Sequence, residues 1–300
     1  MVERKRLRVT TPFEKVTQVL PVHGRPGLYR GEIDNNWNAP IIPHGGVMTT
    51  FALRAMQSEL ANPDQTLRSV TTVFAGQVVP GPIEVDVHIL RSGKSASQMY
   101  ASVANSGSKV GHSTIAVFGG TRLGFSFCDL TMPSVPPVED CRSFWDDPPE
   151  DFKRSFNPTF WRNVEGRNAI GHAPWEHWEP GTSERAYWYR FLETPRLADG
   201  TIDPFAIVTL CDTMPGAIGE KIGPSKQIWT SPSADLTVHL VGKARSEWLL
   251  AHNRARQAGD GYASVEMNLW DQHGGLVACA TQVCIFSFPQ GVLDTSGQVV

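Results

Sequence analysis

The sequence lacks the features that define several large classes of protein. No run of about 18 apolar residues occurs, so a membrane-spanning helix is not expected. The five cysteines are odd in number and include no CxxC spacing, which argues against a disulfide framework and a zinc site. Reduced, buried thiols are expected instead. The formal net charge of −3 is small, so nucleic acid and anionic membranes are not expected as partners.

Several catalytic motifs are missing as well. No GxSxG occurs, which argues against a serine hydrolase of the α/β type. Gly93-Lys94-Ser95 resembles the end of a phosphate-binding loop, but His88 stands where the upstream glycine is required. No cluster of residues predicts a metal or another cofactor. Residues 1–11 are basic and polar, without the apolar core of a secretory signal, so a cytoplasmic protein is expected.

What is present is a globular composition long enough for two domains. Apolar residues make up 41% of the 300 residues and charged residues 19%. Prolines and acidic residues gather in residues 132–155, which predicts a linker there. The expected domains are therefore residues 1–131 and 156–300.

The same pattern of elements occurs in both domains. In the first, Pro43-His44-Gly45-Gly46 leads into a predicted helix over residues 47–60. Predicted strands follow over residues 69–79, 84–89, 97–105 and 109–118. In the second, Asp203 and Pro204 begin a predicted helix that runs to about Met214. Four strands are again predicted, over residues 233–240, 247–254, 262–270 and 276–288.

A helix followed by four antiparallel strands, occurring twice, indicates a duplication. A helix of three to four turns followed by a meander predicts that each sheet wraps around and buries its helix. The fold class is therefore α+β, with two similar halves. Sheets joined edge to edge would leave fewer open edges, and a homo-oligomer is compatible with the edges that remain.

Four segments in this order resemble the acyl-CoA thioesterase II family, within the double hot-dog thioesterase-like superfamily. The resemblance covers nearly the whole chain and rests on Pro43-His44-Gly45-Gly46, Leu210-Cys211-Asp212, Ser231-Pro232-Ser233-Ala234-Asp235 and Val277-Ala278-Cys279-Ala280-Thr281-Gln282. It implies a double hot-dog fold and hydrolysis of an acyl thioester of coenzyme A or a carrier-protein arm, with no cofactor. In the family an Asp, a Thr or Ser, and a Gln activate water, which implies Asp212, Ser233 and Gln282 here. Serine in place of the family's frequent threonine keeps the hydroxyl and loses only the methyl group.

These residue types suit the chemistry. An Asp carboxylate accepts the proton of the attacking water, while Gln and Ser orient that water without competing for its charge. Residues His44, Gly45 and Gly46 are expected to bind substrate, because free amides at a helix N-terminus polarise a carbonyl and glycine permits close approach.

The two halves differ at the chemically important positions. When the two halves are aligned by their helices, Leu53 of the first half corresponds to Asp212. Aligned by their last strands, Ile115 stands opposite Gln282. The first half is therefore expected to keep the fold without catalysis, which predicts one site per chain.

Other interpretations stay open. Asp212 could cap a turn before Pro215, Gln282 could make a structural hydrogen bond, and Ser233 could simply begin a strand. The hydroxyl could also come from Thr230 or Ser231. The tryptophan-rich stretch of residues 161–188 could line an acyl pocket or cover the core between the halves. A hydratase or dehydratase of the same fold, or a non-catalytic acyl-binding protein, are the alternative functions.

Overall fold

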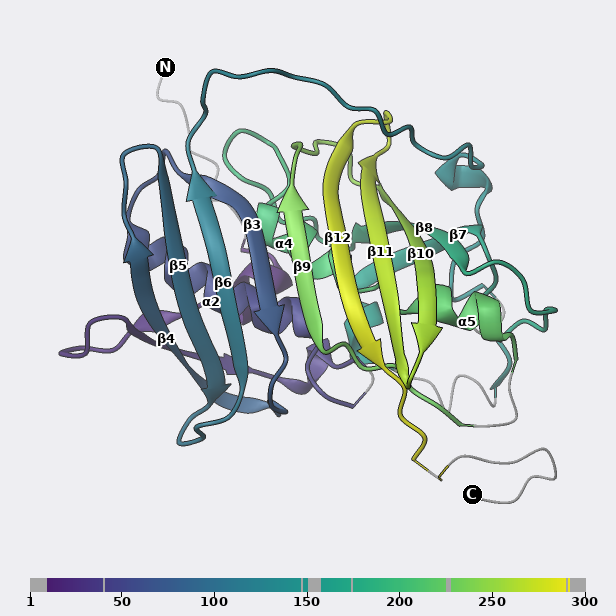
Figure 1. The fold of residues 1–300 in the computed structure, drawn as a ribbon, viewed down its shortest axis with the longest axis horizontal. Coiled ribbons are helices and arrows are strands. Elements are labelled where there is room, and N and C mark those ends of the chain that lie inside the picture. Colours follow the sequence, from purple (N-terminus) through teal and green to yellow (C-terminus); the bar gives the residue numbers. More distant parts are fainter. Residues whose placement is uncertain are drawn as a thin grey trace, which may run out of the picture.

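The computed structural model describes residues 10–39, 41–146, 148–150, 158–173, 175–224, 228–289 and 291. Twelve strands of this part form one antiparallel sheet. The central helix of each half lies against one face of that sheet (Figure 1). The double hot-dog architecture expected from the repeated pattern is confirmed.

The first half contains the predicted helix and four strands, and four elements before them. The elements are α1 (Pro12–Val16), β1 (Leu20–Pro21), β2 (Leu28–Ile33), the 3-10 turn η1 (Asn35–Trp37), α2 (Gly45–Leu60), β3 (Thr66–Val73), β4 (Gly81–Arg91), β5 (Ala96–Asn105) and β6 (His112–Gly119). β3 ends at Val73 rather than at Val79, because the chain turns into the irregular segment before β4. The short α1 escaped prediction although it begins with a complete capping box between Thr11 and Glu14.

The second half repeats this plan, with four elements in addition to the helix and the four strands. The elements are η3 (Thr159–Arg162), β7 (Val164–Ile170), β8 (Glu184–Phe191), α4 (Pro204–Cys211), α5 (Gly216–Ile222), β9 (Asp235–Leu240), β10 (Leu249–Gly259), β11 (Tyr262–Asp271) and β12 (Leu276–Ile285). The predicted helix ends at Cys211 instead of Met214, with Asp212 as its C-cap, and a second helix begins at Gly216.

The two half-sheets join through the antiparallel pairing of β3 with β9. The strand order is β1-β2-β4-β5-β6-β3 in the first half, continued by β9-β12-β11-β10-β8-β7 in the second. At the junction Thr71 faces Thr237, and their Oγ1 atoms lie 3.0 Å apart. The second half thus repeats the first in reverse order, as a two-fold relationship requires, and neither β3 nor β9 remains an open edge.

The helices α2 and α4 cross at the centre of the molecule and obey the same two-fold relationship. Thr50 Oγ1 lies 3.3 Å from the carbonyl oxygen of Phe205, and Thr209 Oγ1 lies 3.1 Å from that of Gly46. The two hydroxyls themselves are 3.1 Å apart. Every residue of α4 after Pro204 is buried, since the sheet covers one side of the helix and α2 the other.

This relationship tests the two alignments made from the sequence. Because Thr50 corresponds to Thr209, Leu53 corresponds to Asp212, as expected. The alignment of the last strands was wrong by one residue. Ile115 is 51% exposed on the outer face of the sheet, whereas Gln282 is 1% exposed on the inner face. The buried Ala116 is the residue that corresponds to Gln282, because Thr71 pairs with Ile115 and Thr237 pairs with Thr281.

The connection between the halves crosses from one half-sheet to the other (Figure 1). It is irregular over residues 120–137 and then forms the 3-10 turn η2 (Val138–Asp140). From there it packs on the outer face of the second half-sheet, where Val138 and Cys141 join a buried cluster with Trp188, Trp248 and Trp270. Residues 147 and 151–155 of the predicted linker, like residues 1–9 of the basic N-terminal segment, lie outside the described residues.

Two expectations from composition can be compared with the described residues. No helix in this part of the chain is long and apolar enough to cross a membrane. All five cysteines are unpaired, as expected. Cys141, Cys211 and Cys284 are buried and Cys279 is half-buried. Cys128 is exposed because it lies in the irregular connection, so burial was a wrong expectation for that thiol.

Candidate active site

Asp212 lies where the C-terminus of α4 meets the N-terminus of α2. Its side chain is only 7% exposed. The amide nitrogen of Gly46, on α2, donates a hydrogen bond of 2.7 Å to Oδ2. The side-chain amide of Gln282, on β12, donates to Oδ1. Asp212 and Gln282, predicted from widely separated segments, therefore meet, and they do so against the first half of the chain.

Two opposing effects set the pKa of Asp212, and together they suit a general base. Burial raises the pKa of the Asp212 carboxyl above its usual range, because the ionised form loses water. His44, the amides of Gly45 and Gly46, and Gln282 oppose this by stabilising the carboxylate. The N-terminal dipole of α2 acts in the same direction. A buried carboxylate with several donors and a raised pKa is typical of a catalytic group.

His44 is the N-cap residue of α2, and its ring makes no capping hydrogen bond. Its Nδ1 lies 3.3 Å from Oδ2 of Asp212 without hydrogen-bond geometry. The ring stacks on Phe160, with centroids 4.0 Å apart and planes at 8°. Burial lowers the pKa of His44, and the neighbouring Asp212 carboxylate partly opposes this shift. His44 therefore lines the site next to the Asp212 carboxylate.

Glycine is required at the start of α2 because Asp212 and α4 lie so close. A Cβ atom on Gly46 would lie 2.7 Å from the Cα atom of Thr209, and one on Gly45 would lie 2.8 Å from Oδ2 of Asp212. The sequence-based hypothesis assigned these amides to the substrate carbonyl. In the structure the Gly46 amide donates to Asp212 and so holds the carboxylate, and substrate binding by His44, Gly45 and Gly46 stays a prediction.

Ser233 lies in the same cavity but makes no hydrogen bond to Asp212 or Gln282 among the described residues. Its backbone pairs with Cys284, two residues from Gln282 on the inner face of β12. This makes Ser233 a diagonal neighbour of Gln282. Thr230 and Ser231 line the cavity too, so all three candidate hydroxyls remain near the carboxylate.

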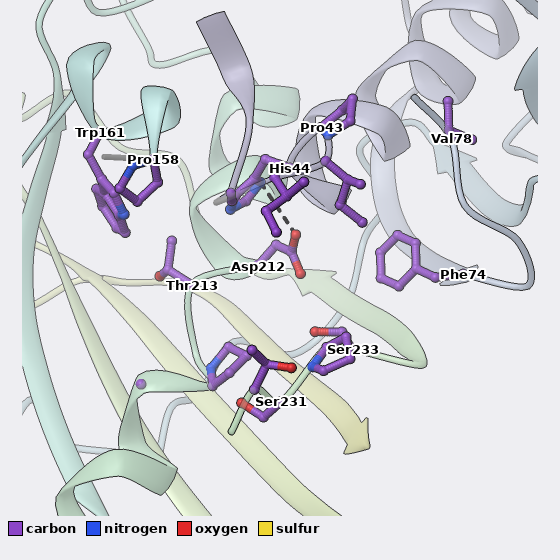
Figure 2. A pocket seen from close by; sticks show the side chains of 18 of the residues that line it. Pro43, His44, Phe74, Val78, Pro158, Trp161, Asp212, Thr213, Ser231 and Ser233 are labelled. Carbon is purple, nitrogen blue, oxygen red and sulfur yellow. Dashed lines mark ion pairs between the residues drawn. The ribbon is translucent and has the colours of Figure 1, made fainter. Parts of the chain in front are cut away.

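These residues surround a cavity of about 850 Å³. Figure 2 shows Asp212 between His44 and the Ser231–Ser233 segment. Trp161 and Pro158 stand on one side of it, and Phe74 and Val78 on the other. Sequence patterns missed much of the lining, because it comes from irregular segments and from both halves. The further lining residues are Ala39, Ile41, Ile42, Pro43, Ala75, Gly76, Gln77, His112, Phe144, Trp145, Trp175, Arg185, Tyr189, Thr213, Pro215 and Gly216.

The tryptophan-rich stretch divides between its two predicted roles. Trp161 and Trp175 line the cavity. Trp188 belongs to the cluster on the outer face of the sheet and donates from Nε1 to the carbonyl oxygen of Pro136. Trp188 faces outward because successive side chains of β8 point to opposite faces of the sheet, whereas Trp161 lies in η3 and Trp175 in an irregular segment.

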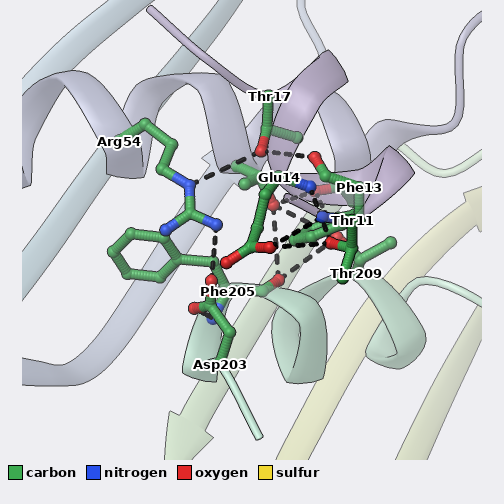
Figure 3. Close-up of polar contacts among 10 residues, drawn as sticks. Thr11, Phe13, Glu14, Thr17, Arg54, Asp203, Phe205 and Thr209 are labelled. Carbon is green, nitrogen blue, oxygen red and sulfur yellow. Dashed lines mark hydrogen bonds and ion pairs between the residues drawn. The ribbon is translucent and has the colours of Figure 1, made fainter. Parts of the chain in front are cut away.

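The equivalent place in the first half holds a structural ion pair. By the two-fold relationship His44 corresponds to Asp203, and Leu53 to Asp212. There Arg54 Nη2 lies 2.5 Å from Oδ2 of Asp203, and Thr17 at the end of α1 accepts from Nε of Arg54 at 3.5 Å (Figure 3). Arg54 also lies over the ring of Phe205, 4.8 Å from its centroid. These contacts and the apolar Leu53 leave the first half without an equivalent of the Asp212 site.

The thiols near the site are not nucleophiles. Burial raises the pKa of Cys284 to about 12, and it also raises that of Cys211. Both groups therefore stay protonated at neutral pH, whereas a nucleophilic cysteine needs its thiolate. Among the described residues, no group of three or more His, Cys, Asp or Glu side chains is placed to hold a metal ion.

The architecture defines a double hot-dog protein, and solved structures share it. A conserved hot-dog protein from Alicyclobacillus acidocaldarius has a TM-score of 0.77 and 23% identity, over 94% of this chain and 100% of that one. An acyl-CoA thioesterase II from Mycobacterium marinum has a TM-score of 0.69 and 20% identity, over 93% of this chain and 100% of that one. Identities this low establish the fold alone. A comparison with curated protein sequences found no match.

Comparison of the sequence with models of protein families identifies the family. Residues 33–119 match the acyl-CoA thioesterase N-terminal domain, and residues 138–286 match the acyl-CoA thioesterase C-terminal domain. The chain therefore belongs to the acyl-CoA thioesterase II family, and it is a hydrolase of that family.

Proposed function

We propose that this chain hydrolyses acyl-CoA thioesters at one site, with Asp212 as the base that activates water. The observation that carries the proposal is the cluster formed by Asp212, Gln282 and the Gly46 amide, in which Asp212 lies on the wall of a cavity that both halves line. In the first half, Leu53 and Ala116 replace the two side chains, so no second site of this kind forms.

Each residue has a definite part in the proposed reaction. Asp212 accepts a proton from water while the water oxygen attacks the thioester carbonyl carbon, and the proton then passes to the departing thiolate sulfur. The buried Oε1 of Gln282 has no hydrogen-bond partner among the described residues, so it is free to accept the second proton of the water. Ser233 is a diagonal neighbour of Gln282, with Cα atoms roughly 7–8 Å apart, and its hydroxyl is proposed to help orient the same water.

The test is thiol release from a series of saturated acyl-CoAs by the wild type and by Asp212→Asn. Removal of a general base is expected to lower kcat/KM by about 10²- to 10⁴-fold. Asp86→Asn, at an exposed carboxylate of β4, is the matched control and should leave the rate unchanged. Equal thiol release by wild type and Asp212→Asn would refute the assignment. Water addition to an enoyl-CoA without thiol release would instead indicate the hydratase chemistry of the same fold.

A further inference from the structure

Arg185 is the charged member of an otherwise aromatic row inside the second half. The inner face of β8 presents Arg185, Tyr187, Tyr189 and Phe191, since alternate residues of a strand share a face. The guanidinium carbon lies 3.7 Å from the ring centroid of Tyr187. This cation–π contact holds the guanidinium by its flat face and leaves the N–H groups at its edge available for a planar anion.

No carboxylate of the described residues pairs with Arg185. Neighbouring arginines of the same sheet region differ in this respect. Arg190 is paired with Glu165 at 2.7 Å, and Arg254 with Glu184 at 2.8 Å. The Nε of Arg185 is buried and has no hydrogen-bond partner in the described part of the chain. A partly buried arginine without an anion is unfavourable, so a ligand that supplies one would stabilise it.

The guanidinium lies in the cavity that holds Asp212. Arg185 is the single lysine or arginine among the described lining residues. It is not the counter-ion of Asp212, because that carboxylate is stabilised by His44, Gly45, Gly46 and Gln282. A Cβ atom on Gly216 would overlap Nη1 of Arg185, so this end of the side chain rests against the first residue of α5.

The distance along the chain limits which part of a substrate reaches Arg185. Gly216 is four residues from Asp212, so their Cα atoms are at most about 14 Å apart, and closer in the turn between α4 and α5. The phosphates of coenzyme A are separated from the thioester by the whole pantetheine arm. A group near the carbonyl, on the acyl chain, is the better match. Trp161, Trp175 and Tyr189 line the same region and would cover its carbon atoms.

We infer that Arg185 binds a carboxylate at the far end of the acyl group, so that the preferred substrates are coenzyme A monothioesters of dicarboxylic acids. The inference rests on the proposed function of the Asp212 site and specifies its substrate class. The carboxylate pairs with the guanidinium edge in the two-point geometry that arginine favours. A saturated acyl chain of equal length leaves the guanidinium without an anion and binds less well.

The experiment compares adipoyl-CoA with hexanoyl-CoA and with the methyl ester of adipoyl-CoA. Wild type is expected to prefer adipoyl-CoA by roughly 10- to 100-fold in kcat/KM, the range of a charge-assisted hydrogen bond. Arg185→Gln should remove the preference, mainly through KM, and should change hexanoyl-CoA turnover by less than about threefold. Arg256→Gln, at an exposed arginine of β10, is the charge-matched control and should keep the preference.

A second variant protects the test against misfolding. Gly216→Ala keeps the arginine and its charge but displaces the guanidinium, so it should also reduce the adipoyl-CoA preference. A direct readout is the binding of free adipate by calorimetry, which should be lost in Arg185→Gln and retained in Asp212→Asn.

The outcomes separate this inference from the proposed function. Asp212-dependent hydrolysis of hexanoyl-CoA and adipoyl-CoA at equal rates would overturn the role of Arg185 and leave the hydrolase proposal standing. No thiol release from any acyl-CoA would refute the hydrolase proposal. In that case adipate binding by wild type, lost in Arg185→Gln, would still support a carboxylate site, and equal adipate binding or none would overturn it.

Discussion

The carboxylate of Asp212 and the amide of Gly46, 166 residues apart in the chain, are joined by a hydrogen bond of 2.7 Å. One residue ends a helix of the second half, and the other begins a helix of the first. The site therefore depends on the crossing of α2 and α4, and neither half can form it alone. Changes at the crossing and changes at the carboxylate should consequently have separable effects.

Asp212→Asn should stabilise the folded protein at neutral pH although it lowers kcat/KM. Because burial raises the pKa of Asp212 in the folded state, the unfolded chain ionises first as pH rises above about 4. The free energy of unfolding therefore falls as pH rises from the unfolded pKa to the folded pKa of Asp212. The neutral Asn side chain does not titrate, so the variant avoids this loss. Thermal unfolding should give a higher Tm for the variant at pH 7, with the difference shrinking in acid. A lower Tm at pH 7 would contradict the prediction.

Gln282→Leu should shift the pH profile. The amide of Gln282 lowers the pKa of Asp212 by donating to its carboxylate, so its loss raises that pKa further. The base is active only when ionised. The acid limb of kcat/KM should therefore move to higher pH, and the maximal rate should fall because the water loses an acceptor. A reduced rate with an unchanged acid limb would assign Gln282 to water positioning alone.

Ser233→Ala should lower kcat/KM by roughly 10- to 100-fold, the cost of losing one positioned hydrogen-bonding group. Ser231→Ala and Thr230→Ala should each stay within about threefold of wild type. The three variants are matched, since each removes one hydroxyl from the same wall of the cavity. If Thr230→Ala or Ser231→Ala shows the large loss instead, the hydroxyl belongs to that residue.

Gly46→Ala should impair both folding and turnover. The added methyl would lie 2.7 Å from the Cα atom of Thr209 and 3.1 Å from Cβ of Asp212, so α2 and α4 must separate. Overpacking of this kind costs about 1–3 kcal/mol. Gly219→Ala is the control, because its Cβ would meet no atom within 4 Å and alanine favours the helix α5. Denaturant unfolding and thiol release would measure the two effects, and equal behaviour of both variants would contradict the packing argument.

Arg54→Met should destabilise the protein without impairing catalysis. Asp203 is 3% exposed and would be left with a buried charge, which costs about 3 kcal/mol or more. Arg30→Met, which breaks the exposed pair with Glu84, should cost less than about 1 kcal/mol. Urea unfolding would compare the two variants. A large fall in kcat/KM for Arg54→Met at full folding would show that the first half contributes to the chemistry.

Local patterns predicted the central helices and the eight repeated strands. The spacing of apolar residues along a strand or helix shows which of its faces is buried, and this spacing can be read from the sequence. The strand β7 and the helices α1 and α5 escaped because they are short or lack a clear period. Ile115 was misaligned because a slip of one residue along a strand exchanges its two faces.

By itself, the sequence determined the duplication and the asymmetry between Leu53 and Asp212, since both are matters of order and residue type. Only the tertiary structure decided that Gly46 holds the carboxylate, that Arg54 and Asp203 fill the equivalent place, and that Arg185 enters the cavity unpaired by any described carboxylate. These relationships join residues far apart in the chain. They depend on how two helices cross and which side chains that crossing leaves facing one another, and no local spacing encodes that.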